Sequence, residues 1–314
     1  MKDYNFWQKI KKPILALAPM AGFTDSAFRQ ICSAYGADVV YSEMASVTAL
    51  HYNPNSDSPT LKLLKHNKRC ENNYVVQLFG SDPEHFAEAT RIITKQIKPA
   101  GLDINFGCPV GKVIKQGAGS DLMKDLVRSR AVIEAVINNT HLPVSIKIRA
   151  KSGEIGALDF LAAISDLPLA AVMIHGRTVS EGFAGDINYE LIKSARQVFS
   201  GIILANGGIN NLAQAQNTLE LTQADGLGLA RGILGRPWLF SEVKKGKIKD
   251  LKIKEIFKIA LRQAKLCEKL KGSSGIVELR KHLCWYVQGL TGASVYRSKL
   301  VKVENYQDIK NILK

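Results

Sequence analysis

The sequence predicts an α/β protein, a (β/α)8 TIM barrel followed by a small C-terminal all-α helical domain, from three observations. Eight short apolar runs recur through the first 240 residues, mostly separated by amphipathic stretches of helical length. Strand alternating with helix implies parallel strands joined by right-handed crossovers, and a barrel of eight such units typically takes around 250 residues. Beyond residue 240 the strand pattern stops and only helical periodicity remains.

The expected elements follow from periodicity and from the turns between them. The strands are Ile14–Ala18, Val39–Glu43, Tyr74–Phe79, Leu102–Phe106, Val144–Arg149, Ala171–His175, Ile202–Asn206 and Gly226–Ala230. The helices between them include Thr24–Ala34, Pro83–Ile97, Asp125–Asn138, Ile155–Ser165, Tyr189–Phe199 and Leu212–Leu221.

Polar residues at the strand ends favour a barrel over a doubly wound open sheet. Gln77, Asn105, Lys147, His175 and Asn206 all stand at or near the carboxyl end of an expected strand. A barrel brings its strand ends together on one face, where barrel enzymes place their sites, whereas an open sheet spreads them along an edge. Convergence of these side chains therefore favours the barrel.

The chain is expected to divide into a catalytic barrel, residues 1–240, and a helical domain, residues 241–314. Residues 241–254 are lysine-rich and fit no single pattern. Helices are expected at Ile256–Lys269 and Val277–Leu290, on either side of a flexible Gly-Ser-Ser-Gly turn at 272–275, and a third at Asn305–Leu313. This domain is too small to fold alone, so we expect it to pack on the barrel.

The net charge of +15 is concentrated near the C-terminus. Residues 241–314 hold 18 Lys and Arg against 7 Asp and Glu, a net of +11, which leaves +4 for the first 240 residues. A basic region indicates a polyanionic partner such as nucleic acid, because phosphate neutralisation supplies most non-specific affinity. A solvated, Lys-rich helical surface explains the charge equally well.

The remaining bulk features predict a cytoplasmic protein. No apolar run approaches the roughly 20 residues of a membrane span, and the N-terminus lacks the apolar segment of an export signal. Five scattered cysteines without a CxxC pair argue against a disulfide framework and against a zinc site, so we expect no metal. No obligatory protein partner is evident, and we expect a monomer.

The stretch 103–119, DINFGCPVGKVIKQGAG, is the richest in chemical groups. Its strand breaks at Gly107, and Pro109 prevents the sheet from continuing because proline lacks the N–H. Asn105 and Cys108 therefore emerge together at a strand end. A nucleophilic cysteine needs a lowered pKa and a nearby base, whereas a general acid needs a thiol that stays protonated at neutral pH. The alternative is a buried small hydrophobe, but the Gly-Cys-Pro break favours function.

Three cationic or titratable side chains follow the fifth and sixth strands. Alternation places Lys147 on the same face as Arg149, toward the barrel mouth, where it can pair with an electron-rich ring, hold a phosphate or form a Schiff base. His175 can donate to a ligand oxygen, and Arg177 can bind a phosphate through its forked guanidinium. A lysine reaching toward solvent and a satisfied core histidine are the structural alternatives.

Glycine-rich segments follow the seventh and eighth strands, at Asn206-Gly207-Gly208 and Gly228-Leu229-Ala230-Arg231-Gly232. Glycine also serves ordinary turns, so neither segment is specific alone. Loops after these two strands commonly form the phosphate site of a barrel. Their position therefore favours a phosphorylated cofactor.

Several motifs, in order and at suitable spacings, resemble those of the tRNA-dihydrouridine synthases. They are APMAGFTD at 18–25, VQLFG at 76–80, DINFGCP at 103–109 with Lys112-Val113, IHGRT at 174–178 and GRPW at 235–238. The HLCWY motif at 282–286 is most similar to the bacterial DusB branch. The resemblance covers nearly the whole chain, from about Ile14 to Leu290.

The resemblance implies noncovalently bound FMN, a tRNA partner and NADPH as the reductant of the flavin. The family reduces the C5=C6 bond of particular uridines in the tRNA D-loop. Cys108 would be the catalytic proton donor to C5 while flavin N5 supplies hydride to C6, and Asn105 and Arg177 would bind the substrate. The implied cofactor residues are Pro19, Met20, Ala21, Gln77, Lys147, His175, Asn206, Gly207, Gly208, Ala230 and Arg231.

The chain departs from the family pattern at a few positions. Gly208 stands where an Asp is often found, and Gly111 and Val179 stand where basic residues are common. Ala150-Lys151-Ser152 replaces the usual Thr-Gly-Trp. None of these changes removes Cys108, so we expect an active enzyme.

Three other functions remain open at this level. A dihydroorotate dehydrogenase-like barrel acts on a free pyrimidine and has no use for the basic domain. A Schiff-base aldolase using Lys147 is colourless, and borohydride traps its covalent adduct. A barrel that has lost catalysis binds tRNA but leaves its uridines unchanged.

Overall fold

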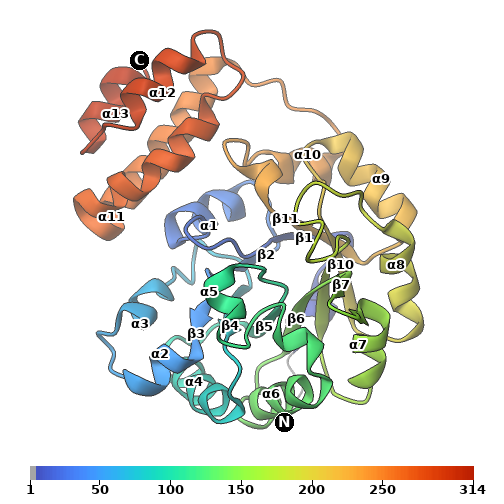
Figure 1. The fold of residues 1–314 in the computed structure, drawn as a ribbon. Helices are drawn as coiled ribbons and strands as arrows, with labels where there is room; N and C mark the ends of the chain where they lie inside the picture. The colour runs from blue at the N-terminus through green and yellow to red at the C-terminus, as the bar shows by residue number, and fades with distance from the viewer. Residues whose placement is uncertain (1–4) are drawn as a thin grey trace.

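The computed structural model describes residues 5–314, and its main sheet is a closed barrel of parallel strands (Figure 1). Strand β1 pairs with both β2 and β11, and these pairings complete the ring. The barrel strands are β1 (Ile14–Leu17), β2 (Val39–Tyr41), β4 (Tyr74–Phe79), β5 (Gly101–Phe106), β6 (Val144–Arg149), β9 (Ala171–His175), β10 (Ile202–Asn206) and β11 (Gly226–Leu229). The predicted TIM barrel is confirmed, and the open sheet is excluded.

Apolar side chains fill the amino-terminal end of the barrel. The short 3-10 helix η1 (Phe6–Lys9) places Phe6 and Trp7 there, 2% and 1% exposed. They pack with Ile14 and Val39 from β1 and β2, and Phe6 lies beside Gly101 at the start of β5. Because this end is packed, the interior opens toward the carboxyl ends of the strands.

Helices surround the barrel, and aspartates cap several of them. Asp25, Asp82 and Asp125 each accept a backbone N–H from the first turn of a helix, which satisfies one of its free donors. The helices of the barrel are α1 (Ser26–Ala34), α2 (Val47–Tyr52), α3 (Pro59–Leu63), α4 (Pro83–Gln96), α5 (Gly111–Ile114), α6 (Leu126–Asn138), α7 (Ala157–Ala163), α8 (Tyr189–Ser194), α9 (Leu212–Thr222) and α10 (Leu239–Lys245), with 3-10 turns η2 (Leu122–Lys124), η3 (Ala195–Gln197) and η4 (Arg231–Ile233).

The structure differs from the predicted elements mainly at short segments. Helices α2, α3 and α5 and strand β3 (Ala45–Ser46) were not predicted, because such short segments carry too little periodicity. The helix expected from Ile155 begins at Ala157, because β8 (Ile155–Gly156) pairs with β7 (Lys151–Ser152). The helix expected over Tyr189–Phe199 is divided between α8 and η3.

Helix α10 connects the barrel to the tail. It spans position 240, where the domain division was expected, and Leu239 and Phe240 are part of the barrel core. The Lys244 ammonium lies 2.5 Å from the Asp38 carboxylate. The ambiguous segment 241–254 therefore begins as a helix held against the barrel.

The tail is a helical hairpin followed by two short helices (Figure 1). Helix α11 (Ile253–Tyr286) leaves helical geometry at Gly272, with φ 63° and ψ −148°. Its two halves lie side by side, since the Tyr286 hydroxyl donates to Gln263 Oε1 over 2.8 Å. The predicted pair of helices is thus present, with a turn tighter than the four residues expected. Helix α13 (Tyr306–Ile312) matches its prediction, and α12 (Ala293–Leu300) was missed.

The tail packs on α1. Ala27 and Ile31 of α1 share an apolar cluster with Phe257 and Leu283 of α11. Over the described residues, no helix is both long enough and apolar enough to cross a membrane.

Candidate active site

A cavity of about 500 Å³ lies at the carboxyl ends of the barrel strands. All fourteen predicted site residues line it. They are Pro19, Met20, Ala21, Gln77, Asn105, Cys108, Lys147, His175, Arg177, Asn206, Gly207, Gly208, Ala230 and Arg231. The structure thus brings the whole predicted set together, although their individual roles stay predictions.

Cys108 lies on a turn just after β5 and is half-buried at the cavity wall. Asn105, the penultimate residue of β5, shapes the turn because its Oδ1 accepts the backbone N–H groups of Gly107 and Cys108, at 3.1 and 2.9 Å. Pro109 follows and cannot donate to a ladder. The thiol is therefore held at the strand end and faces the cavity.

Behind this turn, buried polar side chains form a continuous chain. Asn105 Nδ2 donates to Gln77 Oε1 over 2.9 Å, and Gln77 Nε2 donates to Asp103 Oδ2 over 2.7 Å. The Ser145 hydroxyl donates to the other Asp103 oxygen over 2.6 Å. Burial raises the pKa of Asp103 to about 6, opposed by these two hydrogen bonds and by Lys147. The carboxylate is ionised at neutral pH and accepts both bonds.

Four cations converge on the cavity. They are Lys147, Arg149, Arg177 and Arg231, and across residues 5–314 no carboxylate forms a salt bridge with any of them. Burial, helped by Arg149, lowers the pKa of Lys147 to about 8. Burial and the neighbouring cations lower the pKa of His175 to about 2, so its imidazole is neutral. Such a site attracts an anion.

Glycines give the floor of the cavity its shape near β10 and β11. Gly207 has φ +113°, and a Cβ there would lie 2.6 Å from a ring carbon of His175. A Cβ on Gly228 would lie 2.6 Å from the sulfur of Met173. Any larger residue at these positions would therefore displace a neighbour. The Asn206 amide donates to the Gly228 carbonyl over 2.7 Å, which ties the two strand ends together.

The sequence did not identify several residues of the cavity wall. Phe183, 57% exposed, lies on the loop after β9, with the Arg231 guanidinium 3.9 Å from its ring centre. Arg149 holds this loop by donating to the carbonyls of Thr178 and Gly182, both at 3.0 Å. A lone aromatic residue in a polar loop was the available signal for Phe183, and it was not specific.

The tail also contributes to the cavity. Trp285 of α11 lines it, and the neighbouring His282 packs its ring against Phe23, with ring centres 5.1 Å apart. An ion pair of 3.0 Å joins Lys271 of α11 to Asp25. The loop after β1 is therefore held between barrel and tail.

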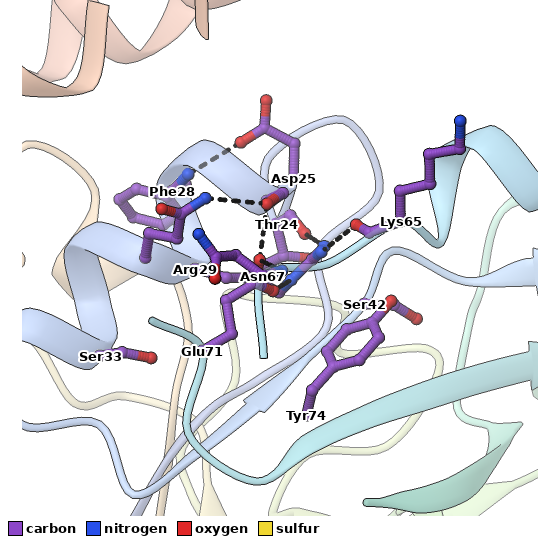
Figure 2. Close-up of polar contacts among 12 residues, drawn as sticks. Thr24, Asp25, Phe28, Arg29, Ser33, Ser42, Lys65, Asn67, Glu71 and Tyr74 are labelled. Carbon is purple, nitrogen blue, oxygen red and sulfur yellow. Dashed lines mark hydrogen bonds and ion pairs between the residues drawn. The ribbon is translucent and has the colours of Figure 1, made fainter. Parts of the chain in front are cut away.

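A buried ion pair supports the same loop from below (Figure 2). Arg29 Nε donates to Glu71 Oε2 over 2.5 Å, and both side chains are fully buried. Arg29 also donates to the carbonyls of Thr24 and Lys65, at 2.7 and 2.9 Å. The Thr24 hydroxyl accepts the N–H of Met20, a cavity residue. Arg29 thus fixes the backbone that carries Met20.

The described residues include no cluster of three or more His, Cys, Asp or Glu side chains able to hold a metal ion. The groups that face the cavity are a thiol, amides, a neutral imidazole and cations. Chemically, they can hold a planar anionic ligand and transfer a proton to a second molecule beside it.

Solved structures with the same fold include flavoenzymes by name. A histamine dehydrogenase from a Rhizobium species aligns with a TM-score of 0.59 at 14% identity, over 84% of this chain and 50% of that one. An old yellow enzyme homologue from Zymomonas mobilis aligns with a TM-score of 0.52 at 14% identity, over 76% and 90%. At these identities the likeness establishes the barrel fold alone.

Relatives in sequence are considerably more similar. A tRNA-dihydrouridine synthase B from Pasteurella multocida is 34% identical over 291 residues, which covers 90% of this chain and 86% of the relative. A probable tRNA-dihydrouridine synthase 1 from Synechocystis is 32% identical over 304 residues, covering 94% and 84%. The model of a family described as dihydrouridine synthase (Dus) matches residues 16–314. This chain therefore belongs to the dihydrouridine synthase family.

Proposed function

We propose that this protein is a tRNA-dihydrouridine synthase that reduces the C5=C6 bond of specific D-loop uridines, with FMN as cofactor and NADPH as reductant. Family membership and the names of the relatives support the reaction. The division of labour between a barrel, residues 1–240, and a basic tRNA-binding region, residues 241–314, is part of the proposal.

The cavity has the groups that FMN requires. Its glycine floor after β10 and β11, with Arg231 alongside, suits a phosphate, because backbone N–H groups and a cation are exposed there. Pro19, Met20 and Ala21 offer a surface for the flat ring, and Gln77 and Lys147 face its polar edge. When bound, FMN supplies the hydride for uracil C6 and is recharged by NADPH.

Cys108 acts as the proton donor. Its thiol, held by the Asn105 turn at the cavity wall, delivers a proton to uracil C5 as negative charge develops there. Lys147 and neutral His175 supply positive charge and a hydrogen-bonding group without competing for that proton. Arg177 contacts the substrate.

The basic tail binds the tRNA and brings a uridine to the cavity. Extruding a base costs a few kcal/mol of lost stacking, which contacts between Lys or Arg and phosphate offset. Lys281 lies at the cavity rim, with its ammonium 5.2 Å from the ring centre of Phe23. It can therefore reach the nucleic acid beside the entrance.

The observation that carries this proposal is a half-buried thiol on the wall of a cation-rich cavity. We expect purified protein to be yellow, with FMN released on denaturation. Cys108→Ala should keep flavin bleaching by NADPH but lose roughly 10²–10⁴-fold in dihydrouridine formation, the usual loss for a positioned acid.

Cys70→Ala, at an exposed thiol far from the cavity, is the matched control and should be fully active. A colourless protein that does not take up FMN would contradict the cofactor assignment. Unchanged tRNA reduction in Cys108→Ala would remove Cys108 from the chemistry.

A further inference from the structure

The chain of hydrogen bonds behind Cys108 has a direction. A side-chain amide donates at its nitrogen and accepts at its oxygen, and it can be turned end over end. The N–H of Cys108 donates only, so Asn105 must present its oxygen to the turn. At the far end the ionised Asp103 carboxylate accepts only, so Gln77 must present its nitrogen.

The two amides therefore have a single compatible orientation. With its nitrogen committed to Asp103, Gln77 offers its oxygen to Asn105, whose nitrogen donates over 2.9 Å. The Asn105 oxygen is then left facing the backbone of the Cys108 turn. Reversing either amide would place two donors or two acceptors opposite each other in a buried setting, which is costly.

This chain is built on rigid elements. Gln77 and Asp103 are register partners on the adjacent strands β4 and β5. Asp103 is fully buried and Gln77 is 1% exposed, so water cannot replace the partners. Asp103 does not line the cavity. Any influence of Asp103 on the reaction must therefore pass through other side chains.

We propose that Asp103 is a positioning residue for Cys108: its carboxylate orients Gln77 and Asn105, and the Asn105 oxygen holds the thiol-bearing turn. The inference rests on the proposed role of Cys108 as proton donor for its catalytic meaning. Its structural content, that a carboxylate two side chains away sets the geometry of the turn, can be measured without any substrate.

The test exchanges the two ends of the chain. Asp103→Asn removes the obligatory acceptor, and Asn105→Asp removes the donor to Gln77. In the double variant Asp103→Asn/Asn105→Asp, every bond can form again with Gln77 reversed. A carboxylate at position 105 accepts from both Gln77 and the turn, and an amide at position 103 donates to Gln77. Charge and volume are conserved.

The first readout is the rate at which iodoacetamide alkylates Cys108 in the FMN-loaded protein, followed on the Cys108 peptide by mass spectrometry. Side chains within one network are coupled by the equivalent of roughly 2- to 150-fold. We expect each single variant to change the rate about tenfold and the double variant to return to within about threefold of wild type.

The second readout separates the two half-reactions. Misplacing a reacting group by about 1 Å costs roughly 10²-fold, so oxidation of the reduced Asp103→Asn enzyme by tRNA should slow by that factor. Bleaching of its flavin by NADPH should stay within about twofold of wild type, because that step does not use Cys108. A general loss of structure would slow both.

Ser145→Ala is the matched control, because it removes a 2.6 Å bond to the same carboxylate but leaves the path to Cys108 intact. It should alkylate at the wild-type rate. The proposal is wrong if Asp103→Asn alkylates like wild type, or if the double variant is no closer to wild type than Asn105→Asp. The latter comparison decides the matter if Asp103→Asn does not fold. A wild-type protein inactive on tRNA would refute the proposed function and leave the alkylation result standing.

Discussion

Replacing Glu71 with glutamine should destabilise the protein far more than the loss of one surface ion pair would. Glu71 Oε1 accepts from the Ser26 hydroxyl and from the N–H of Asn67, at 2.6 and 2.8 Å (Figure 2). These donors keep the oxygen of a glutamine at that position. Its NH₂ group must then replace Oε2, directly opposite the Nε–H of Arg29.

The magnitude follows from burial. Both side chains are 0% exposed, so Arg29 keeps its charge, loses its counter-ion and faces a second donor. Breaking a buried pair by removing one partner costs about 3–5 kcal/mol. At about 2 °C per kcal/mol for a chain of this length, the melting temperature should fall by roughly 6–10 °C. The backbone under Met20 loosens with Arg29, so FMN should also dissociate faster.

The assay is thermal unfolding at a fixed excess of FMN, because a bound ligand raises the apparent melting temperature. Asp166→Asn is the matched control: it makes the same change opposite Arg130, at a pair of 2.5 Å whose side chains are 63% and 37% exposed. It should cost at most about 1 kcal/mol. If Glu71→Gln melts within about 2 °C of the Asp166 variant, the argument from burial fails.

Two further predictions concern the charges around the cavity. Burial and Arg149 lower the pKa of Lys147 to about 8. An anion favours the ammonium form, so FMN affinity should be highest below pH 8 and fall as pH rises through it, by up to about tenfold per unit. Titrating apoprotein with FMN checks this, and Lys147→Gln should bind weakly without that slope; parallel curves would contradict it. Charge reversal at exposed Lys281 and Arg297 should weaken tRNA binding and flatten its salt dependence by about one unit of slope per lost contact, while NADPH oxidation is unchanged. Lys95→Glu, near the end of α4, is the control, and an equal effect there would assign no special role to the tail.

The barrel and the membership of its cavity were predictable because both depend on local pattern. Each long strand is an apolar run between turns, and parallel strands around a barrel direct their carboxyl ends to one face. Residues as far apart as Pro19 and Arg231 could therefore be assigned to one site. The position of Cys108 at the cavity wall follows from the Gly-Cys-Pro break alone.

What could not be predicted depends on register and on contacts between distant segments. The direction of the Asn105 amide follows from the pairing of Gln77 with Asp103, which no single strand encodes. The contact between Phe183 and Arg231 joins a loop to another strand end. The tight turn at Gly272 requires a left-handed backbone that glycine permits but does not dictate.

Trp285 links the order of synthesis to the appearance of the cavity. It belongs to the second half of α11, near the end of the chain, yet it forms a wall beside residues of the first strand's loop. Since chains emerge from the ribosome amino end first, a growing polypeptide can close its ring of strands before this wall exists. A nascent barrel released without its final helices would hold an incomplete pocket, and full ligand retention would mark the finished molecule.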